Sequence, residues 1–262
     1  MGKDTKIEWA THSWNPWFGC AQIQGRRACQ NCYAKAFTKR MGLDVFGKDK
    51  ARKLFGERHW REPLTWDAAA AKAGRRDSVF LMSMGDFFDP HPDVRAARSQ
   101  AFRLIEQTPH LVWLVLTKRI RNVSTMMRAN RVYEWPSNMW LGLTVGTQED
   151  ADEDMYVLQD IKAQNTGCHT FVSVEPMLTE INLRPWLSAL CNPDWVICGA
   201  ESAPGKRLGR PLDVDWVRDL RRQCNLFDVP FMYKQGPVDG KLVELPELDG
   251  VVWNQKPVWL EG

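Results

Sequence analysis

A regular alternation of apolar and helical segments constrains the fold of this chain more than any other feature. The segments 94–107, 149–163 and 213–224 have helical spacing, as do residues 31–40 and a stretch ending at Ala129. Six apolar runs of strand length lie at 79–84, 111–117, 139–145, 170–174, 195–199 and 229–233. Continuous apolar strands that alternate with helices are typical of a parallel sheet covered on both faces. With a further strand expected within residues 7–17, the pattern predicts an α/β fold, a full or partial (βα) barrel of parallel strands.

An open, doubly wound sheet is the alternative architecture. Its dinucleotide-binding form needs a Gly-x-Gly-x-x-Gly segment, and the sequence has none, which favours the barrel. The 262 residues, of which 44% are hydrophobic, suit one domain with a full core. We therefore expect residues 1–262 to form a single barrel domain. It would carry a cysteine-bearing loop at 14–33, a basic excursion at 43–78 and a C-terminal tail at 236–262.

Three cysteines near the start of the chain have the spacing of a metal or redox site. Cys20, Cys29 and Cys32 form a C-x8-C-x2-C arrangement. A closed zinc site needs four ligands, and only His12 or His59 is available as the fourth. Cys29 and Cys32 alone suit a redox pair at the start of a helix. An iron–sulfur cluster held by all three cysteines would leave one iron open to a substrate or cofactor.

Polar side chains follow each predicted strand directly. In a barrel these strand ends meet at one mouth, where enzymes of this architecture place their chemistry. Glu175 and Glu201 each end an apolar strand, and a carboxylate in such a place needs a partner or a ligand. The candidate residues of the mouth are Asp86, Lys118, Arg119, Thr144, Gln148, Glu175, Glu201, Ser202, Lys234 and Gln235.

Short motifs spread over the chain carry a family resemblance. They include Trp14-Asn-Pro, Asn31-Cys-Tyr-Ala34, Ser83-Met-Gly-Asp-Phe-Phe88, Leu116-Thr-Lys-Arg119, Val172-Ser-Val-Glu-Pro-Met177 and Gly199-Ala-Glu-Ser202. Through them the chain resembles the phage Gp37/Gp68-like proteins, an atypical branch of the radical S-adenosylmethionine superfamily. The usual pattern there is C-x3-C-x2-C, with an aromatic residue just before the last cysteine. This chain departs from it, since its first gap has eight residues and Tyr33 follows the last cysteine.

The resemblance implies two cofactors, a [4Fe-4S] cluster and S-adenosyl-L-methionine, and a TIM-barrel variant as the fold. An electron from a donor such as flavodoxin or ferredoxin would cleave the second cofactor to a 5′-deoxyadenosyl radical. Cys20, Cys29 and Cys32 are implied as the cluster ligands. Asp86 occupies the place that receives the methionine amino group, and a carboxylate suits that cation.

The same resemblance implies further contacts to S-adenosylmethionine. Thr144 and Gln148 are candidates for hydrogen bonds to the ribose hydroxyls. Lys118 and Arg119 would meet the methionine carboxylate or a substrate phosphate. The remaining candidates are Tyr33 near the adenine, and Glu175 and Glu201 for the ribose, the adenine edge or the substrate.

The substrate is expected to be DNA or a nucleotide. The stretch 48–61 is basic and has Trp60 and Trp66 beside it, which suits a partner with phosphates and stacking bases, although the net charge is only +3. The phage resemblance implies an isomerase or lyase in thymidine hypermodification, which abstracts hydrogen from a modified pyrimidine and rearranges its substituent. Candidate substrate contacts are Arg26, Arg27, Arg119 and Lys234. The alternatives are a radical DNA-repair lyase and a non-catalytic, zinc-bearing nucleic-acid-binding protein.

No stretch of the sequence suggests a membrane location. There is no run of eighteen apolar residues, and the N-terminus lacks an apolar signal core. We expect a cytoplasmic protein, in the host cytoplasm if it is phage-encoded. Its seven cysteines are then expected to be reduced thiols or metal ligands rather than disulfides.

Overall fold

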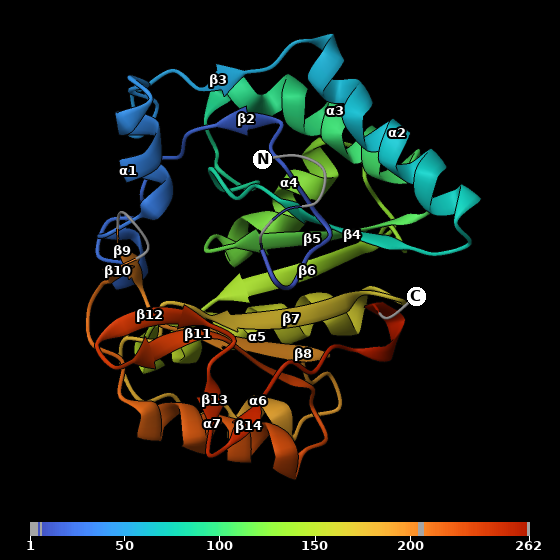
Figure 1. The fold of residues 1–262 in the computed structure, drawn as a ribbon. Helices are drawn as coiled ribbons and strands as arrows, with labels where there is room; N and C mark the ends of the chain where they lie inside the picture. Colours follow the sequence, from blue (N-terminus) through green and yellow to red (C-terminus); the bar gives the residue numbers. More distant parts are fainter. Residues whose placement is uncertain (1–4, 6, 204–206, 261–262) are drawn as a thin grey trace.

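One curled sheet organises the computed structural model, which describes residues 5, 7–203 and 207–260 (Figure 1). Its strand order is β1-β4-β5-β6-β7-β8-β11-β12, parallel from β1 to β11 and antiparallel only between β11 and β12. The strands are β1 His12–Trp14, β4 Asp77–Leu81, β5 Leu111–Thr117, β6 Met139–Thr144, β7 His169–Val174, β8 Trp195–Gly199, β11 Phe231–Val238 and β12 Lys241–Glu244. In the described part of the chain β1 and β12 are its two edges, so the barrel is partial, which is one of the two forms that the alternation of segments predicts.

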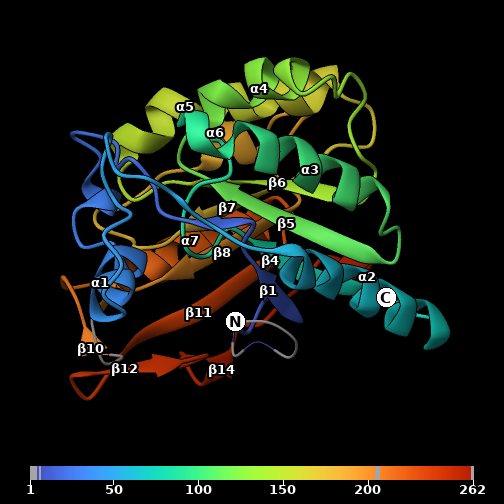
Figure 2. The same ribbon diagram turned by 90° about the horizontal axis from the view of Figure 1, so that it is seen from above.

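Helices connect the parallel strands, and Figure 2 shows α3, α4 and α5 gathered on one side of the sheet. Side-chain caps fix two helix starts: Thr147 accepts from the Asp150 N–H at 3.2 Å, and Asp213 accepts from the Asp215 N–H at 2.9 Å. The helices are α1 Tyr33–Arg40, α2 Glu57–Lys72, α3 Arg95–Glu106, α4 Val123–Ala129, α5 Gln148–Gln164, α6 Arg184–Leu187 and α7 Val214–Leu226.

Short elements complete the chain. Three small antiparallel pairs join β2 Trp17–Phe18 to β3 Lys53–Leu54, β9 Ser202–Ala203 to β10 Arg207–Leu208, and β13 Glu247–Leu248 to β14 Val251–Val252. Single 3-10 turns are η1 Arg27–Cys29, η2 Pro92–Val94, η3 Ile120–Asn122 and η4 Val258–Leu260. Within the described residues, no helix is both long enough and apolar enough to cross a membrane.

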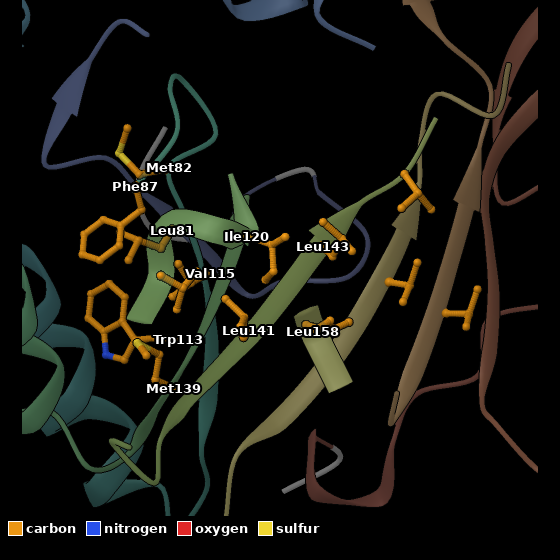
Figure 3. Packing of buried hydrophobic residues seen from close by; sticks show 14 of the residues in the cluster. Leu81, Met82, Phe87, Trp113, Val115, Ile120, Met139, Leu141, Leu143 and Leu158 are labelled. Carbon is orange, nitrogen blue, oxygen red and sulfur yellow. The ribbon is translucent and has the colours of Figure 1, made fainter. Parts of the chain in front are cut away.

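Both faces of the sheet are buried, which explains why the strands are continuously apolar. Leu81, Trp113 and Leu141 pack under the helices on the convex face and are fully buried (Figure 3). Neighbouring residues on the same strands, such as Phe80 and Leu114, point to the other face, because side chains alternate along a strand. A second apolar cluster there unites Trp9, Ala10, Phe80, Val112, Leu114, Trp140, Phe171, Trp195, Ile197 and Met232.

The structure corrects some expected boundaries. The predicted strand at 79–84 runs from Asp77 to Leu81, because Met82 has a positive φ of 71° and turns the chain out of the strand. The excursion expected at 43–78 contains the 16-residue helix α2, which has Pro63 in its interior. The expected tail at 236–262 holds β12, β13 and β14, and the predicted strand at 229–233 begins at Phe231 and continues to Val238.

Candidate functional site

A cavity of about 620 Å3 lies at the carboxyl ends of the parallel strands. Its apolar wall includes Trp9, Phe80 and Leu116 from the concave side of the sheet. Polar residues that follow β4, β5, β7 and β8 converge on it, as do Lys234 and Gln235 within β11 and three cysteines. An apolar cavity with a few convergent polar groups is the usual composition of a small-molecule site.

All three cysteines of the loop line this cavity. Cys20, Cys29 and Cys32 all line it, and each is a free, partly exposed thiol. Cys29 ends the η1 turn and Cys32 immediately precedes α1. The described residues contain no group of three or more His, Cys, Asp or Glu side chains arranged to hold a metal ion. The cysteines therefore face one space without forming a compact single-ion site.

Two glycines bring the cysteine loop against the end of β4. The Gly19 N–H donates to the Met84 carbonyl at 3.0 Å, and Gly19 and Gly85 form an isolated parallel bridge. Gly19 has a φ of +109°, and a Cβ there would lie 2.2 Å from the Val45 carbonyl oxygen. Only glycine satisfies both this conformation and this close approach, so the residue before Cys20 fixes how the loop meets the sheet.

Arg119 lies against the first cysteine. Its Nη2 is 3.7 Å from Cys20 Sγ, donates to the Ala21 carbonyl, and is 3.9 Å from Asp89 Oδ1. Burial raises the pKa of the Cys20 thiol strongly and the charge of Asp86 raises it further, while Arg119 lowers it in part. Cys20 is thus protonated in the absence of a ligand, and a bound metal would displace that proton.

The carboxylate of Asp86 joins the ends of two neighbouring strands. It accepts hydrogen bonds from Thr117 Oγ1 at 2.8 Å, from the Lys118 N–H at 3.0 Å and from the Phe88 N–H at 2.9 Å. Asp86 and Lys118 both line the cavity, after β4 and β5. The three donors fix the orientation of a carboxylate that is only 6% exposed.

An ion pair connects the residue after β7 to the middle of β11 inside the cavity. Lys234 Nζ lies 2.5 Å from Glu175 Oε1, and Gln235 Nε2 donates to the same oxygen at 3.1 Å. Both charged side chains are about four-fifths buried. The pair therefore presents a fixed acceptor and a fixed cation side by side.

Glu201 binds the segment between the second and third cysteines to the sheet. It accepts from Arg210 Nε at 2.9 Å, from the Arg210 N–H at 3.0 Å and from Asn31 Nδ2 at 3.0 Å. Burial acts to raise the pKa of Glu201, but the hydrogen bonds from Arg210 and Asn31 outweigh it, so the pKa is lowered. Arg210 also donates to Gln30 Oε1 and to the Arg27 carbonyl, both at 3.1 Å.

The structure brings together most of the residues predicted for the mouth. Those that line the cavity are Cys20, Cys29, Cys32, Tyr33, Asp86, Lys118, Arg119, Glu175, Glu201, Ser202, Lys234 and Gln235. Sequence analysis missed Arg210 and Asn31, because neither ends an apolar strand. It also missed the wall formed by Phe37 and Arg40 of α1, whose only signal was helical spacing after Cys32.

Four predicted residues do not line the cavity. Thr144 is buried, and the Gln148 side chain bonds Asp152 at 2.8 Å on the surface of α5. Both lie behind the cysteine loop, since a Cβ at Gly146 would be 3.1 Å from the Ala28 Cβ. The other two, Arg26 and Arg27, stand in the loop itself.

The loop arginines point away from the cavity. Arg26 Nη1 lies 2.7 Å from Asp150 Oδ1, and its Nη2 pairs with Asp154, so this side chain holds the loop to α5. The two carboxylates raise the pKa of Arg26 despite its burial. Arg27 is exposed and does not line the cavity.

Comparison with known proteins places the fold and the family. A solved structure of a mutant spore photoproduct lyase matches with a TM-score of 0.52 and 10% sequence identity. The match covers 88% of this chain and 78% of that chain, and at this identity it concerns the fold. No curated protein matches the sequence. A family model described as "Protein of unknown function (DUF5131)" matches residues 4–257, and this chain belongs to that family.

Proposed function

We propose that this protein is a radical S-adenosylmethionine enzyme whose cluster is held by Cys20, Cys29 and Cys32. One observation carries the proposal: three free thiols line a large cavity at the carboxyl mouth of a partial barrel. Cysteine thiolates are the usual ligands of iron–sulfur clusters, and all three thiols line the same cavity. With three protein ligands, one iron of a four-iron cluster would be open to the second cofactor.

The surroundings of the two candidate histidines favour a cluster over zinc. His12 stacks on Trp66 with 4.5 Å between ring centroids and lies 3.6 Å from Asp77. His59 Nε2 bonds the Asn15 carbonyl at 2.9 Å. Neither histidine lines the cavity, so a fourth zinc ligand from them would require a rearranged loop.

The chain's own residues would bind and orient the second cofactor. The chemistry that the two cofactors supply is reductive cleavage of a sulfonium, which yields a 5′-deoxyadenosyl radical able to abstract hydrogen. Asp86 and Lys118 line the cavity, where the carboxylate of Asp86 would accept from the methionine ammonium group and Lys118 would meet the methionine carboxylate. Since Thr144 and Gln148 lie outside the cavity, we assign the ribose contacts to Glu175 and Gln235.

We propose a modified pyrimidine of DNA as the substrate, with rearrangement of its substituent as the reaction. The cations Lys118, Arg119 and Lys234 of the apolar cavity support a partner with phosphates and a ring. The basic stretch 48–61 does not line this cavity: Arg52 is buried against Asp89, and Trp60 packs against the core cluster that contains the buried Trp66. Flavodoxin or ferredoxin would supply the electron, in the cytoplasm. Repair of a damaged pyrimidine by a lyase reaction is the second candidate, favoured by the fold shared with spore photoproduct lyase.

Anaerobic purification tests the cluster directly. The expected result is a brown protein with about four irons and matching sulfide per chain, which forms 5′-deoxyadenosine when a reductant and S-adenosylmethionine are added. Cys20→Ala, Cys29→Ala and Cys32→Ala should each lose the iron. Cys191→Ala is the matched control, because that thiol is partly exposed but outside the cavity. A colourless protein with stoichiometric zinc would overturn the proposal.

The two substrate candidates are separated by their products. Anaerobic reactions with oligonucleotides that carry a hypermodified thymidine, or a photoproduct, would be digested to nucleosides and analysed by mass spectrometry. A rearranged thymidine supports the first candidate, and restored thymidine supports the second. Turnover of neither oligonucleotide, with deoxyadenosine still formed, would overturn both substrates while leaving the cofactor assignment intact.

A further inference from the structure

Helix α1 has two apolar faces, and only one of them is buried. Its inner face packs Ala34 against Phe18, Val45 and Phe46. Its outer face places Tyr33, Phe37 and Met41 one above the other, at positions i, i+4 and i+8 from the helix start through its C-cap. These three side chains are 50%, 38% and 53% exposed. A helix of a globular protein normally buries such a stripe, so this one is available to a partner.

The stripe lies along the rim of the cavity. Tyr33 and Phe37 line the cavity together with Arg40, and Ser202 and Glu244 line it as well. Figure 1 shows α1 beside β9 and β10 at this end of the sheet. The Tyr33 hydroxyl donates to the Ser83 carbonyl, which holds its ring at the rim. A partner on the stripe would therefore extend directly into the cavity.

The charges of α1 define the chemistry of that partner. The helix carries Lys35, Lys39 and Arg40, all exposed, and no acidic residue. The Arg40 guanidinium lies over the Phe37 ring, 5.6 Å from its centroid. Aromatic faces interleaved with cations are the arrangement that binds single-stranded nucleic acid, in which bases stack on the rings and phosphates contact the cations.

We propose that the Tyr33–Phe37–Met41 stripe is a docking surface for single-stranded DNA. A base stacks on Phe37, phosphates contact Lys39 and Arg40, and the neighbouring nucleotide enters the cavity. This inference rests on the proposed function for its choice of DNA, and it deepens that function by requiring the substrate base to be unpaired. A duplex has its bases stacked already and would have to expose one before it could use this surface.

A second arginine–aromatic pair supplies a matched control. Arg121 lies over the Tyr156 ring, also 5.6 Å from its centroid, and Tyr156 is 47% exposed. Neither residue lines the cavity. Tyr156 belongs to α5, whose first turns carry the carboxylates of Glu149, Asp150, Asp152, Glu153 and Asp154. The control pair thus has the same geometry in an acidic setting that would repel phosphates.

The test is fluorescence anisotropy of a labelled oligonucleotide titrated with the anaerobically purified protein. Phe37→Ala should weaken binding of single-stranded DNA by about 5- to 150-fold, the range expected for loss of one stacked base. Phe37→Trp should restore it. Arg40→Ala should weaken binding and reduce its salt dependence, since one phosphate contact is lost. Tyr156→Ala and Arg121→Ala should bind like the unaltered protein.

Several results would overturn the inference. These are equal binding by Phe37→Ala and the unaltered protein, equal losses in Phe37→Ala and Tyr156→Ala, or tighter binding of duplex DNA or of RNA of the same sequence. Light scattering that shows a dimer which Phe37→Ala dissociates would assign the stripe to a second copy of the chain instead. DNA binding and iron content test this inference and the proposed function separately. If a protein without iron still bound single-stranded DNA through Phe37, this inference would stand and the proposed function would be rejected.

Discussion

Arg119 donates to the thiol of Cys20, with 3.7 Å between Nη2 and Sγ, and so places a permanent positive charge beside a proposed cluster ligand. Positive charge and hydrogen bonds at a ligand sulfur favour the reduced cluster. Arg119→Ala should therefore shift the reduction potential to a more negative value, measured by a redox titration followed by electron paramagnetic resonance.

Two further variants separate charge from structure at this position. Arg119→Lys keeps the charge but loses the planar donor, and its potential should fall between those of Arg119→Ala and the unaltered protein. Arg121→Ala removes an arginine near α5 and should leave the potential unchanged. If Arg119→Ala keeps its iron and its potential does not move, the contact has no electronic role.

The ion pair between Arg52 and Asp89 lies beneath the cysteine loop and is completely buried. Arg52 Nε donates to Asp89 Oδ2 at 2.9 Å, and Arg52 Nη1 donates to the Gly47 carbonyl at 3.0 Å. Removing one partner leaves the other charge without compensation, so Arg52→Ala should lower the free energy of unfolding by about 3–5 kcal/mol. Urea denaturation measures this loss, and Lys50→Ala, which breaks an exposed pair with Asp44, should show none.

Gly19 and Gly25 distinguish steric fit from backbone conformation in the cysteine loop. Both have positive φ values, +109° and +83°, but only Gly19 has a neighbour within reach of a Cβ. Gly25→Ala should cost about 1 kcal/mol for its backbone alone. Gly19→Ala should cost about 3 kcal/mol or more, since it adds an overlap with Val45, and should bind less iron. Equal unfolding midpoints and iron contents would show that the loop does not depend on this contact.

The lowered pKa of Glu201 predicts a pH dependence of stability. A carboxyl group whose pKa is lower in the folded state than in the unfolded state stabilises the fold when it is ionised. This stabilisation is fully present above the unfolded pKa, which is about 4.3 for glutamate. It is lost as the pH falls through the pKa of the folded state. Glu201→Gln should flatten the stability profile below about pH 4.3. Arg210→Ala should flatten the same part of the profile, and the double variant should add little. Unchanged acid midpoints would reject the assignment.

The unbroken apolar character of the strands was the most predictive signal in the sequence. Because both faces of the sheet are buried, runs such as residues 111–116 are apolar throughout, and their order along the chain is also their order in the sheet. The polar residues after these strands converge on one cavity for the same reason, since parallel strands end at one edge. Asp86, Glu175 and Glu201 could thus be found from the sequence alone.

The remaining features depend on contacts between distant segments. Arg210 bonds Glu201 and the carbonyl of Arg27, and neither spacing nor hydrophobicity marks it in the sequence. The partners of Arg26 could not be predicted from the sequence for the same reason, because they lie 124 and 128 residues away on α5. Thr144 also occupies a strand end, but the cysteine loop covers that end, and only the packing of Ala28 beside Gly146 reveals it.

The cavity is assembled from both ends of the chain, since its walls include Trp9, the cysteines, Lys234 and Glu244. During synthesis the cysteines leave the ribosome early, and about two hundred residues separate Cys32 from the last of these walls. At ordinary translation rates this interval is about 10 to 40 s. For that time the thiols have no enclosing wall, so any ligand that reached them then would meet the cysteine loop before its pocket exists.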